Sequence, residues 1–422
     1  MKSVIEVFRE FLILGLSSFG GPTAHIAFFR DRFVERKKWL TEADFADLLA
    51  LCQFLPGPAS SQFGLSLGWK RAGWAGAFAA WVAFTFPSAL LLILFGLGVM
   101  KYGGGLEGGA GWLKGLQIAV VAVIAGAVTS MWKTLCTDRP RQLLALAAAA
   151  ILLGTGIAWM QLVVIALGAV AGWFLFRDDQ TEKSPTGLNE GLERVESSTE
   201  KCSSLQGSSL QGSSQQGSAQ QGRVSGAVCL VLFFVLLLGL PLVSKIQPGQ
   251  PLEAFTAMYR SGSLVFGGGH VVLPLLSQEV VEPGWVGREE FLAGYGAAQA
   301  VPGPLFTFSG YLGSLIEGPG GPWGMATICL IGIFLPAWLL VLGLMPFWHS
   351  VVRRPGIRAA LAGTNAAVVG LLGAALYNPV WIGAIQSSKD LVFLIGVASS
   401  LLVMKWPPWV VVIAAGVVGH FW

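Results

Sequence analysis

The chain has 422 residues, of which 54% are hydrophobic and 12% are charged, and its mean hydropathy is +0.66. Because a typical soluble domain carries about 25% charged residues, this composition excludes an ordinary soluble globule and predicts an integral membrane protein. The formal net charge of +4 is modest, and the sequence contains no P-loop or dinucleotide-binding motif. Neither a nucleic acid partner nor a nucleotide cofactor is therefore expected.

The first 21 residues mix the charged Glu6, Arg9 and Glu10 with apolar residues and lack a small-residue cleavage site. They are expected to belong to the mature protein and not to a signal peptide. Long apolar windows follow, each at least as long as the roughly 20 residues that a membrane-spanning helix needs. These windows are 74–100, 112–132, 142–176, 224–244, 322–345, 357–378 and 389–422. The predicted fold class is an all-α polytopic membrane protein surrounded by the lipid bilayer.

Five cysteines are scattered over the chain without CxxC or Cys/His spacing. Free cysteine packs like a small hydrophobic residue, so thiols packed within the membrane are expected and a disulfide framework is not. The sequence predicts no metal and no cofactor. The GxSxG motif and other common enzyme signatures are absent, so the protein is not expected to be an enzyme.

A polar segment rich in Ser, Gln and Gly, residues 177–223, interrupts the apolar pattern. Such a segment cannot bury enough apolar area to offset its ordering entropy, which predicts a disordered linker. The linker separates a first repeat, 1–176, from a linking transmembrane helix, 224–244, and a second repeat, 245–422.

The two halves are predicted to be internal repeats because matching motifs recur at offsets of 246 to 249. The motif pairs are Phe19-Gly20-Gly21 with Phe266-Gly267-Gly268, Gln53 to Pro58 with Gln299 to Pro304, Phe86-Pro87 with Leu335-Pro336, and Gln117 with Asn365. The segment 224–244 has no partner in the first half, and a single extra crossing turns the second copy over. The sequence therefore predicts two inverted-topology repeats, the plan of many secondary transporters.

The breaks at Gly20-Gly21-Pro22 and Pro56-Gly57-Pro58 can be loops between full crossings or the tips of re-entrant helical hairpins. Full crossings would place the basic loop 30–38 on the opposite side from Lys70 and Arg71, whereas hairpins keep all these cations in the cytoplasm. The equivalent loop of the second half, 279–290, is acidic and suits an outward-facing copy. We therefore expect four hairpins, two from each side, with about nine crossings.

Irregular backbone at membrane depth is tolerated only where protein or a watery cavity satisfies its polar groups. A helix N-terminus follows each break, and its free N–H groups and dipole attract anions, as do the hydroxyl and amide donors nearby. This arrangement favours a carrier of a tetrahedral oxyanion. The candidate substrate-binding residues are Gly20, Gly21, His25, Gln53, Gly57, Ser60, Ser61, Gln62, Gln117, Gly267, Gly268, His270, Gln299, Gly303, Thr307 and Asn365.

These residues also have simpler interpretations. The glycines can allow close helix packing, the hydroxyl residues after each PGP break can cap their helices, and the amides Gln117 and Asn365 can link neighbouring helices. The basic residues 30–38 either anchor the chain at the cytoplasmic face or raise the local anion concentration. Asp47 is the candidate for proton coupling, because ionisable residues within membranes usually mark function.

Several motifs together carry a family resemblance: Phe19-Gly-Gly-Pro-Thr-Ala-His25, Gln53-x-x-Pro-Gly-Pro58, Phe86-Pro87, Phe266-Gly-Gly-Gly-His270, Gln299-Ala-Val-Pro-Gly-Pro304 and Gly310-Tyr311-x-Gly313. The pattern resembles the chromate ion transporters in their long, two-domain form, over nearly the whole chain except the linker. The resemblance implies a multi-pass carrier in the cytoplasmic membrane that exports chromate, confers chromate resistance and draws on the proton motive force.

Considered apart from the family resemblance, these residues support a carrier of oxyanions but do not identify which oxyanion it carries. A sulfate or other oxyanion transporter of the same fold is the first alternative, and a passive anion channel is the second. A membrane-bound enzyme such as a chromate reductase would need redox ligands or a cofactor pocket, and the sequence displays neither. Whether the chain forms a homodimer is open at this stage.

Overall fold

The computed structural model describes residues 2–102, 111–155, 160–177, 212–352 and 354–421. Within these ranges every regular element is helical and no strand occurs, which confirms the predicted all-α fold class. Among the described helices, five are long and apolar enough to cross a membrane: Ala59–Lys101, Gly111–Leu135, Arg223–Ile246, Gly321–Phe347 and Pro355–Ala384. The chain is a multi-pass membrane protein.

The first half begins with α1 and α2, which the Gly20 break separates, and ends with a pair of short helices. Its elements are α1 (Lys2–Ser17), α2 (Gly21–Arg30), the π-helical turn η1 (Asp31–Arg36), α3 (Glu42–Phe54), α4 (Ala59–Tyr102), α5 (Gly111–Leu135), α6 (Arg139–Thr155) and α7 (Met160–Leu175).

The second half begins with the long helix α10. Its elements are α10 (Gly212–Ile246), α11 (Gln250–Leu264), η2 (Gly269–Val271), α12 (Val272–Val280), α13 (Arg288–Ala300), η3 (Leu305–Thr307), α14 (Phe308–Leu315), α15 (Gly321–Leu344), η4 (Met345–Phe347), α16 (Trp348–Val352), α17 (Pro355–Ala375), η5 (Leu376–Trp381), α18 (Ile382–Ala384), α19 (Ser388–Leu402) and α20 (Pro408–Phe421).

Two apolar windows predicted from the sequence are not single spans. Window 142–176 forms the two short helices α6 and α7, and window 389–422 forms α19 and α20. In the second case the chain turns at residues 403–407, because Pro407 and Pro408 cannot donate the backbone hydrogen bonds that would continue α19. Each window is therefore a pair of short helices.

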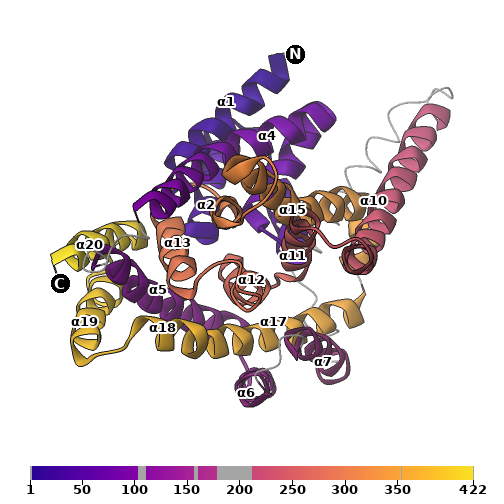
Figure 1. Cartoon of the computed structure of the whole chain (residues 1–422). Helices are drawn as coiled ribbons and strands as arrows, with labels where there is room; N and C mark the ends of the chain where they lie inside the picture. Colours follow the sequence, from indigo (N-terminus) through magenta and orange to yellow (C-terminus); the bar gives the residue numbers. More distant parts are fainter. Residues whose placement is uncertain (1, 103–110, 156–159, 178–211, 353, 422) are drawn as a thin grey trace.

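The end of the predicted linker also differs from expectation. Residues 178–211 lie outside the described residues, but α10 begins at Gly212, so residues 212–223 are helical and continue into the predicted linking helix 224–244. These residues contain no proline that would stop a helix. Helix α10 stands at the edge of the molecule in Figure 1, and 11% of its most apolar window is buried. The outward face of α10 is thus suited to lipid.

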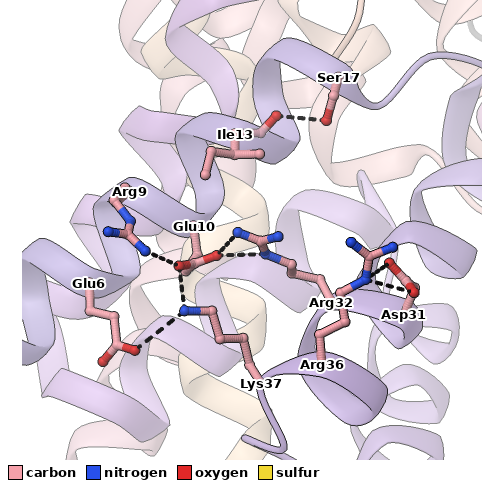
Figure 2. Close-up of polar contacts among 9 residues, drawn as sticks. All are labelled: Glu6, Arg9, Glu10, Ile13, Ser17, Asp31, Arg32, Arg36 and Lys37. Atoms are coloured by element: carbon pink, nitrogen blue, oxygen red, sulfur yellow. Dashed lines mark hydrogen bonds and ion pairs between the residues drawn. The ribbon is translucent and has the colours of Figure 1, made fainter.

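The chain returns on itself at Gly20. The Phe11 and Phe29 rings lie 6.0 Å apart, Arg32 donates from Nε to Glu10 Oε2 over 2.6 Å, and Lys37 Nζ lies 3.9 Å from a Glu6 oxygen (Figure 2). The midpoints of these residue pairs fall between positions 20 and 22. Helices α1 and α2 with η1 therefore form an antiparallel hairpin with its tip at the first glycine break.

The other three breaks make hairpins of the same kind. Contacts between the two arms are Phe45 with Phe63 across the first PGP break, Arg260 with Glu279 across the second glycine break, and Phe291 with Phe308 across the second PGP break. In the last hairpin the Tyr311 hydroxyl also donates to Glu290 O over 2.7 Å. The chain thus turns back into an antiparallel pair of helices at each of the four breaks.

The two halves exchange their terminal helix pairs. Helices α6 and α7 of the first half pack on α17 of the second, while α19 and α20 pack on α5 of the first (Figure 1). A Cβ added at Gly363 would lie 2.1 Å from Gly168 O, and one added at Gly115 would lie 2.0 Å from Ala415 O. Since only glycine permits such approaches, small residues hold the halves together as they do in other membrane bundles.

We predict that Gly363→Ala destabilises the protein by roughly 1–3 kcal/mol, because the new methyl group must push α7 away from α17. Gly373→Ala is the matched control on the same helix, where an added Cβ meets no atom within 4 Å. Thermal unfolding in detergent measures both. An equal effect of the two substitutions would contradict the proposed packing role of Gly363.

Candidate functional site

The four helix breaks meet one another across the two halves. Gly57 of the first PGP break donates its backbone N–H to Val265 O over 2.7 Å, just before the second glycine break. Gly303 of the second PGP break donates to Ser18 O over 3.0 Å, just before the first glycine break. These two bonds form a reciprocal clasp in which each half satisfies polar backbone groups of the other.

The clasp depends on glycine. Gly57 and Gly303 have φ angles of +119° and +97°, a region that L side chains rarely adopt. A Cβ at Gly57 would lie 2.9 Å from Gln62 Nε2, and one at Gly303 would lie 2.8 Å from Ser88 Oγ. Gly57 and Pro58 of the first PGP tip and all three residues of the second are buried, so both tips hold the breaks in contact inside the protein.

A cavity of about 360 Å³ lies beside this clasp. Its polar lining consists of Gly20, Ser130 of α5, His270, Gln299 and Lys405, which come from both halves of the chain. Apolar residues of α5 and of the α19–α20 turn complete the wall. A hydrophobic substrate would leave these polar groups without partners, so the lining suits a small polar solute.

The electrostatics of this cavity favour an anion. Lys405 is the charged residue among its lining groups, and no ion-pair partner for it occurs in the described part of the chain. His270 Nδ1 lies 3.0 Å from the Tyr295 hydroxyl, which leaves its other ring nitrogen for a ligand. The Gln299 amide nitrogen is buried and has no hydrogen-bond partner among the described residues. Lys405, His270 and Gln299 thus offer donors to a ligand.

Gly20, His270 and Gln299 are the sequence-predicted residues that share this cavity. Gly267 lies next to it, since a Cβ added there would be 3.2 Å from Met131, the neighbour of Ser130, and 3.6 Å from Asn365 Oδ1. The adjacent Gly21 and Gly268 belong to the same two hairpin tips and also have positive φ angles.

Other predicted residues bond to the backbone. His25 is buried, and its Nε2 lies 3.1 Å from Ser18 O, the same oxygen that accepts from Gly303. Gln62 donates from Nε2 to Pro56 O over 2.7 Å, and Thr307 donates to Pro304 O over 2.7 Å. These three side chains stabilise the backbone around the breaks by donating hydrogen bonds to it.

The remaining predicted residues are not brought together with the cavity. Gln117 donates from Nε2 to Glu289 O over 3.2 Å, at the start of α13, and so links α5 to α13. Gln53 is exposed on α3, unlike its repeat partner Gln299. Ser60 and Ser61 are buried in the first turn of α4, and neither lines the described cavity. Matched sequence positions therefore have different surroundings in the two halves.

Sequence reasoning missed Ser130 and Lys405. The signal for Lys405 was present, because it is an ionisable residue inside the apolar window 389–422. Splitting that window into α19 and α20 places Lys405 in the turn between them, with a φ of +56°. Ser130 carried no signal, since hydroxyl residues are common in membrane helices.

A second charged residue inside an apolar run, Glu10, was also missed. Its side chain is fully buried and accepts from Arg32 Nε over 2.6 Å and from Lys37 Nζ over 2.7 Å (Figure 2). Arg9 lies 3.3 Å from the same carboxylate. This ion-pair cluster joins the two arms of the first hairpin.

Two further basic residues of the loop 30–38, Arg30 and Arg36, are paired as well. Arg30 lies 2.9 Å from Glu35, and Arg36 Nε lies 2.9 Å from Asp31. Such pairing weakens the field that these cations project into solvent. The interpretation that this loop concentrates anions is therefore less favoured than its role in anchoring the hairpin.

Comparison with known proteins identifies the family. The model of the family described as "Chromate transporter" matches residues 5–173 and again residues 252–420. The chain belongs to the chromate transporter family. The match confirms the resemblance inferred from the motifs, and it leaves out residues 174–251 between the two matched segments.

Relatives of this transporter match over nearly its full length. A "Chromate transport protein" of Cupriavidus metallidurans is 27% identical over 422 residues, which cover 98% of this chain and 92% of the relative. A "Chromate transport protein" of Pseudomonas aeruginosa is 28% identical over 377 residues, 87% of this chain and 79% of the relative. A "Probable chromate transport protein" of Synechococcus elongatus is 27% identical and covers 96% of that relative. No solved structure matches. The family is one of transporters and supports chromate as the transported ion.

We predict that Glu10→Gln destabilises this transporter by about 3 kcal/mol, because it leaves Arg32 and Lys37 beside a buried neutral group. Glu42→Gln, which removes one of the two exposed carboxylates that pair with Arg30, should have little effect because water solvates these charges. Thermal unfolding in detergent measures the difference. If the two variants unfold at the same temperature, the buried cluster does not stabilise the first hairpin.

Proposed function

We propose that this transporter exports chromate from the cytoplasm across the cytoplasmic membrane, that the proton motive force drives export, and that export confers chromate resistance. The observation that carries the proposal is the cavity beside the reciprocal clasp, where Lys405 and uncharged donors converge without a lining carboxylate. Chromate is a small dianion that only accepts hydrogen bonds, so a site rich in donors with one cation suits its charge and chemistry.

Within this proposal, Gly20, Ser130, His270, Gln299 and Lys405 hold the dianion. The other residues chosen from the sequence act through the backbone of the breaks. Gln117 and Gln53 are the least favoured of them, because neither lies at the described cavity.

The inverted arrangement of the repeats is part of the same proposal. Two features support it: the clasp and the exchanged helix pairs are reciprocal, as a twofold axis requires, and one long apolar helix, α10, stands between the halves. An odd number of crossings between two copies places them in opposite orientations. Alternating access then arises when one half rocks against the other around the clasp.

Asp47 is the proposed proton-coupling residue. Its Oδ1 accepts from Trp348 Nε1 over 2.8 Å, and this bond connects α3 of the first half to α16 of the second. A carboxylate at a contact between moving halves can lose that bond when it is protonated, so protonation would be linked to the motion.

The export proposal predicts that resting cells with the transporter accumulate less chromate than cells without it, and that an uncoupler removes the difference. Lys405→Gln should lower the apparent affinity about tenfold, because a hydrogen bond to a charged group contributes about 1.5 kcal/mol. Labelled sulfate in vesicles tests the alternative substrate. Stronger transport of sulfate than of chromate would overturn chromate as the substrate. A difference in chromate accumulation that persists with the uncoupler would overturn the proton motive force as the driving force.

For coupling, we predict that Asp47→Asn still transports chromate but no longer responds to an imposed pH gradient. Asparagine keeps an oxygen that can accept from Trp348, so the fold should be retained, whereas the titratable carboxylate is lost. Trp348→Phe is the matched control, since it removes the donor and leaves the carboxylate. Persistent coupling in Asp47→Asn would show that another residue carries the proton.

A further inference from the structure

A second cavity, of about 480 Å³, lies against α17. Helices α6 and α7 of the first half and α12 of the second close it on two sides. Its polar lining consists of Gln161, Ser277, Gln278, Glu282, Arg288, Tyr377 and Asn378. The family match and the predicted breaks do not account for these residues.

Part of the wall of the second cavity corresponds, by its offset in the sequence, to part of the wall of the first cavity. The lining residues Val123, Gly126, Ala127 and Ser130 of α5 correspond, at a constant offset of 248, to the lining residues Leu371, Ala374, Ala375 and Asn378. Leu401 and Leu402 correspond in the same way to Leu152 and Leu153, at an offset of 249. The walls that α5 and α19 form in the first cavity are therefore equivalent to the walls that α17 and α6 form in the second. The rest of each lining is not matched, because His270 and Gln299 of the first cavity and residues 274–288 of the second all come from the second half.

A continuous segment of chain connects the cavities. His270 lines the first and Pro274 lines the second, and they are four positions apart on η2 and α12, near the centre of Figure 1. The intervening Val271, Val272 and Leu273 are fully buried in the apolar core. A charged solute cannot cross this stretch as it stands, because it would lose its hydration without gaining partners.

We propose that the second cavity is the outward vestibule of the transporter, where Arg288 and Asn378 bind the same small oxyanion before its release. The inference rests on the proposed function, since a vestibule matters only if an oxyanion is carried. In inverted repeats, equivalent surfaces face opposite sides of the membrane, so the cavity at Lys405 takes up the anion from the cytoplasm and the cavity at Arg288 releases it outside.

The charges of the two vestibules suit this direction. Lys405 lines the first cavity without a carboxylate beside it, whereas Glu282 lines the second cavity together with Arg288. The acid offsets the attraction of the guanidinium for a dianion and weakens binding there. The anion binds more strongly at the positive cytoplasmic vestibule than at the neutral outer one. This difference favours its export over its rebinding from outside.

Transport measured from each face tests the assignment. Inside-out vesicles expose the cytoplasmic face and right-side-out vesicles the outer face, and labelled chromate is supplied to each. Arg288→Gln should raise the half-saturation concentration at the outer face about tenfold and leave that at the cytoplasmic face within about twofold. Lys405→Gln should do the reverse, and Glu282→Gln should tighten binding at the outer face.

Matched controls are Glu317→Gln and Lys70→Gln, exposed charges that line neither cavity. Neither control should shift either half-saturation concentration. The vestibule assignment is overturned if Arg288→Gln acts at the cytoplasmic face or at neither face while the wild-type protein transports. Failure of the wild-type protein to move chromate or sulfate in either orientation would instead overturn the export proposal.

Thiol labelling decides the sidedness without relying on transport. Ser130→Cys and Asn378→Cys, equivalent and exposed positions of the two cavities, are placed in a protein whose five native cysteines are replaced. A membrane-impermeant maleimide should label position 130 in inside-out vesicles and position 378 in right-side-out vesicles. Labelling of both from one face would refute two opposed vestibules.

Discussion

The structure depends on a single constraint: helices that break inside a membrane protein must find partners for the N–H and C=O groups that they free. No water is available in hydrocarbon to satisfy these groups. Here Gly57 bonds to Val265 O and Gly303 bonds to Ser18 O, so each half supplies the acceptor that the other lacks. Neither half can meet this requirement alone, and the two repeats are therefore obliged to associate through their breaks.

The rest of the architecture follows from this association. Each PGP tip also contacts the proline-containing helix of the opposite half, Gly303 at Ser88 and Gly57 at Ala337. Further out, small residues let α7 approach α17 and α20 approach α5 through backbone contacts. Close packing between backbones gives strong dispersion contacts without apolar burial from water, which is the form of stabilisation available within a bilayer. Cavities remain beside α5 and α17, where the exchanged helix pairs diverge.

Charge is distributed so that the hairpins are neutralised and the cavity is not. Glu10 pairs with Arg32 and Lys37 in the first hairpin, and Glu279 pairs with Arg260 over 2.6 Å in the second glycine hairpin. The acid lies on the outgoing arm in one hairpin and on the returning arm in the other, so the two clusters are not copies in sequence. Both ion pairs hold two helices together, whereas Lys405 lines the cavity and has no ion-pair partner in the described part of the chain.

Much of this protein was predictable from its sequence, because the relevant signals are local. Hydropathy identified the membrane class, and the glycine and proline motifs located the four hairpin tips, since backbone conformation is decided by neighbouring residues. The family followed from the same motifs. The offset between the halves also indicated which positions are equivalent, for example Gly57 with Gly303.

Tertiary structure decided which of these residues share a site. Gly20, His270 and Gln299 converge on one cavity although they are separated by most of the chain, while Gln117 bonds to Glu289 O instead. Lys405 enters the cavity only because Pro407 and Pro408 turn an apolar window into two helices that pack on the opposite half. A sequence specifies local backbone geometry, but contacts between distant segments depend on how whole helices pack, and that packing decided which residues line the cavity.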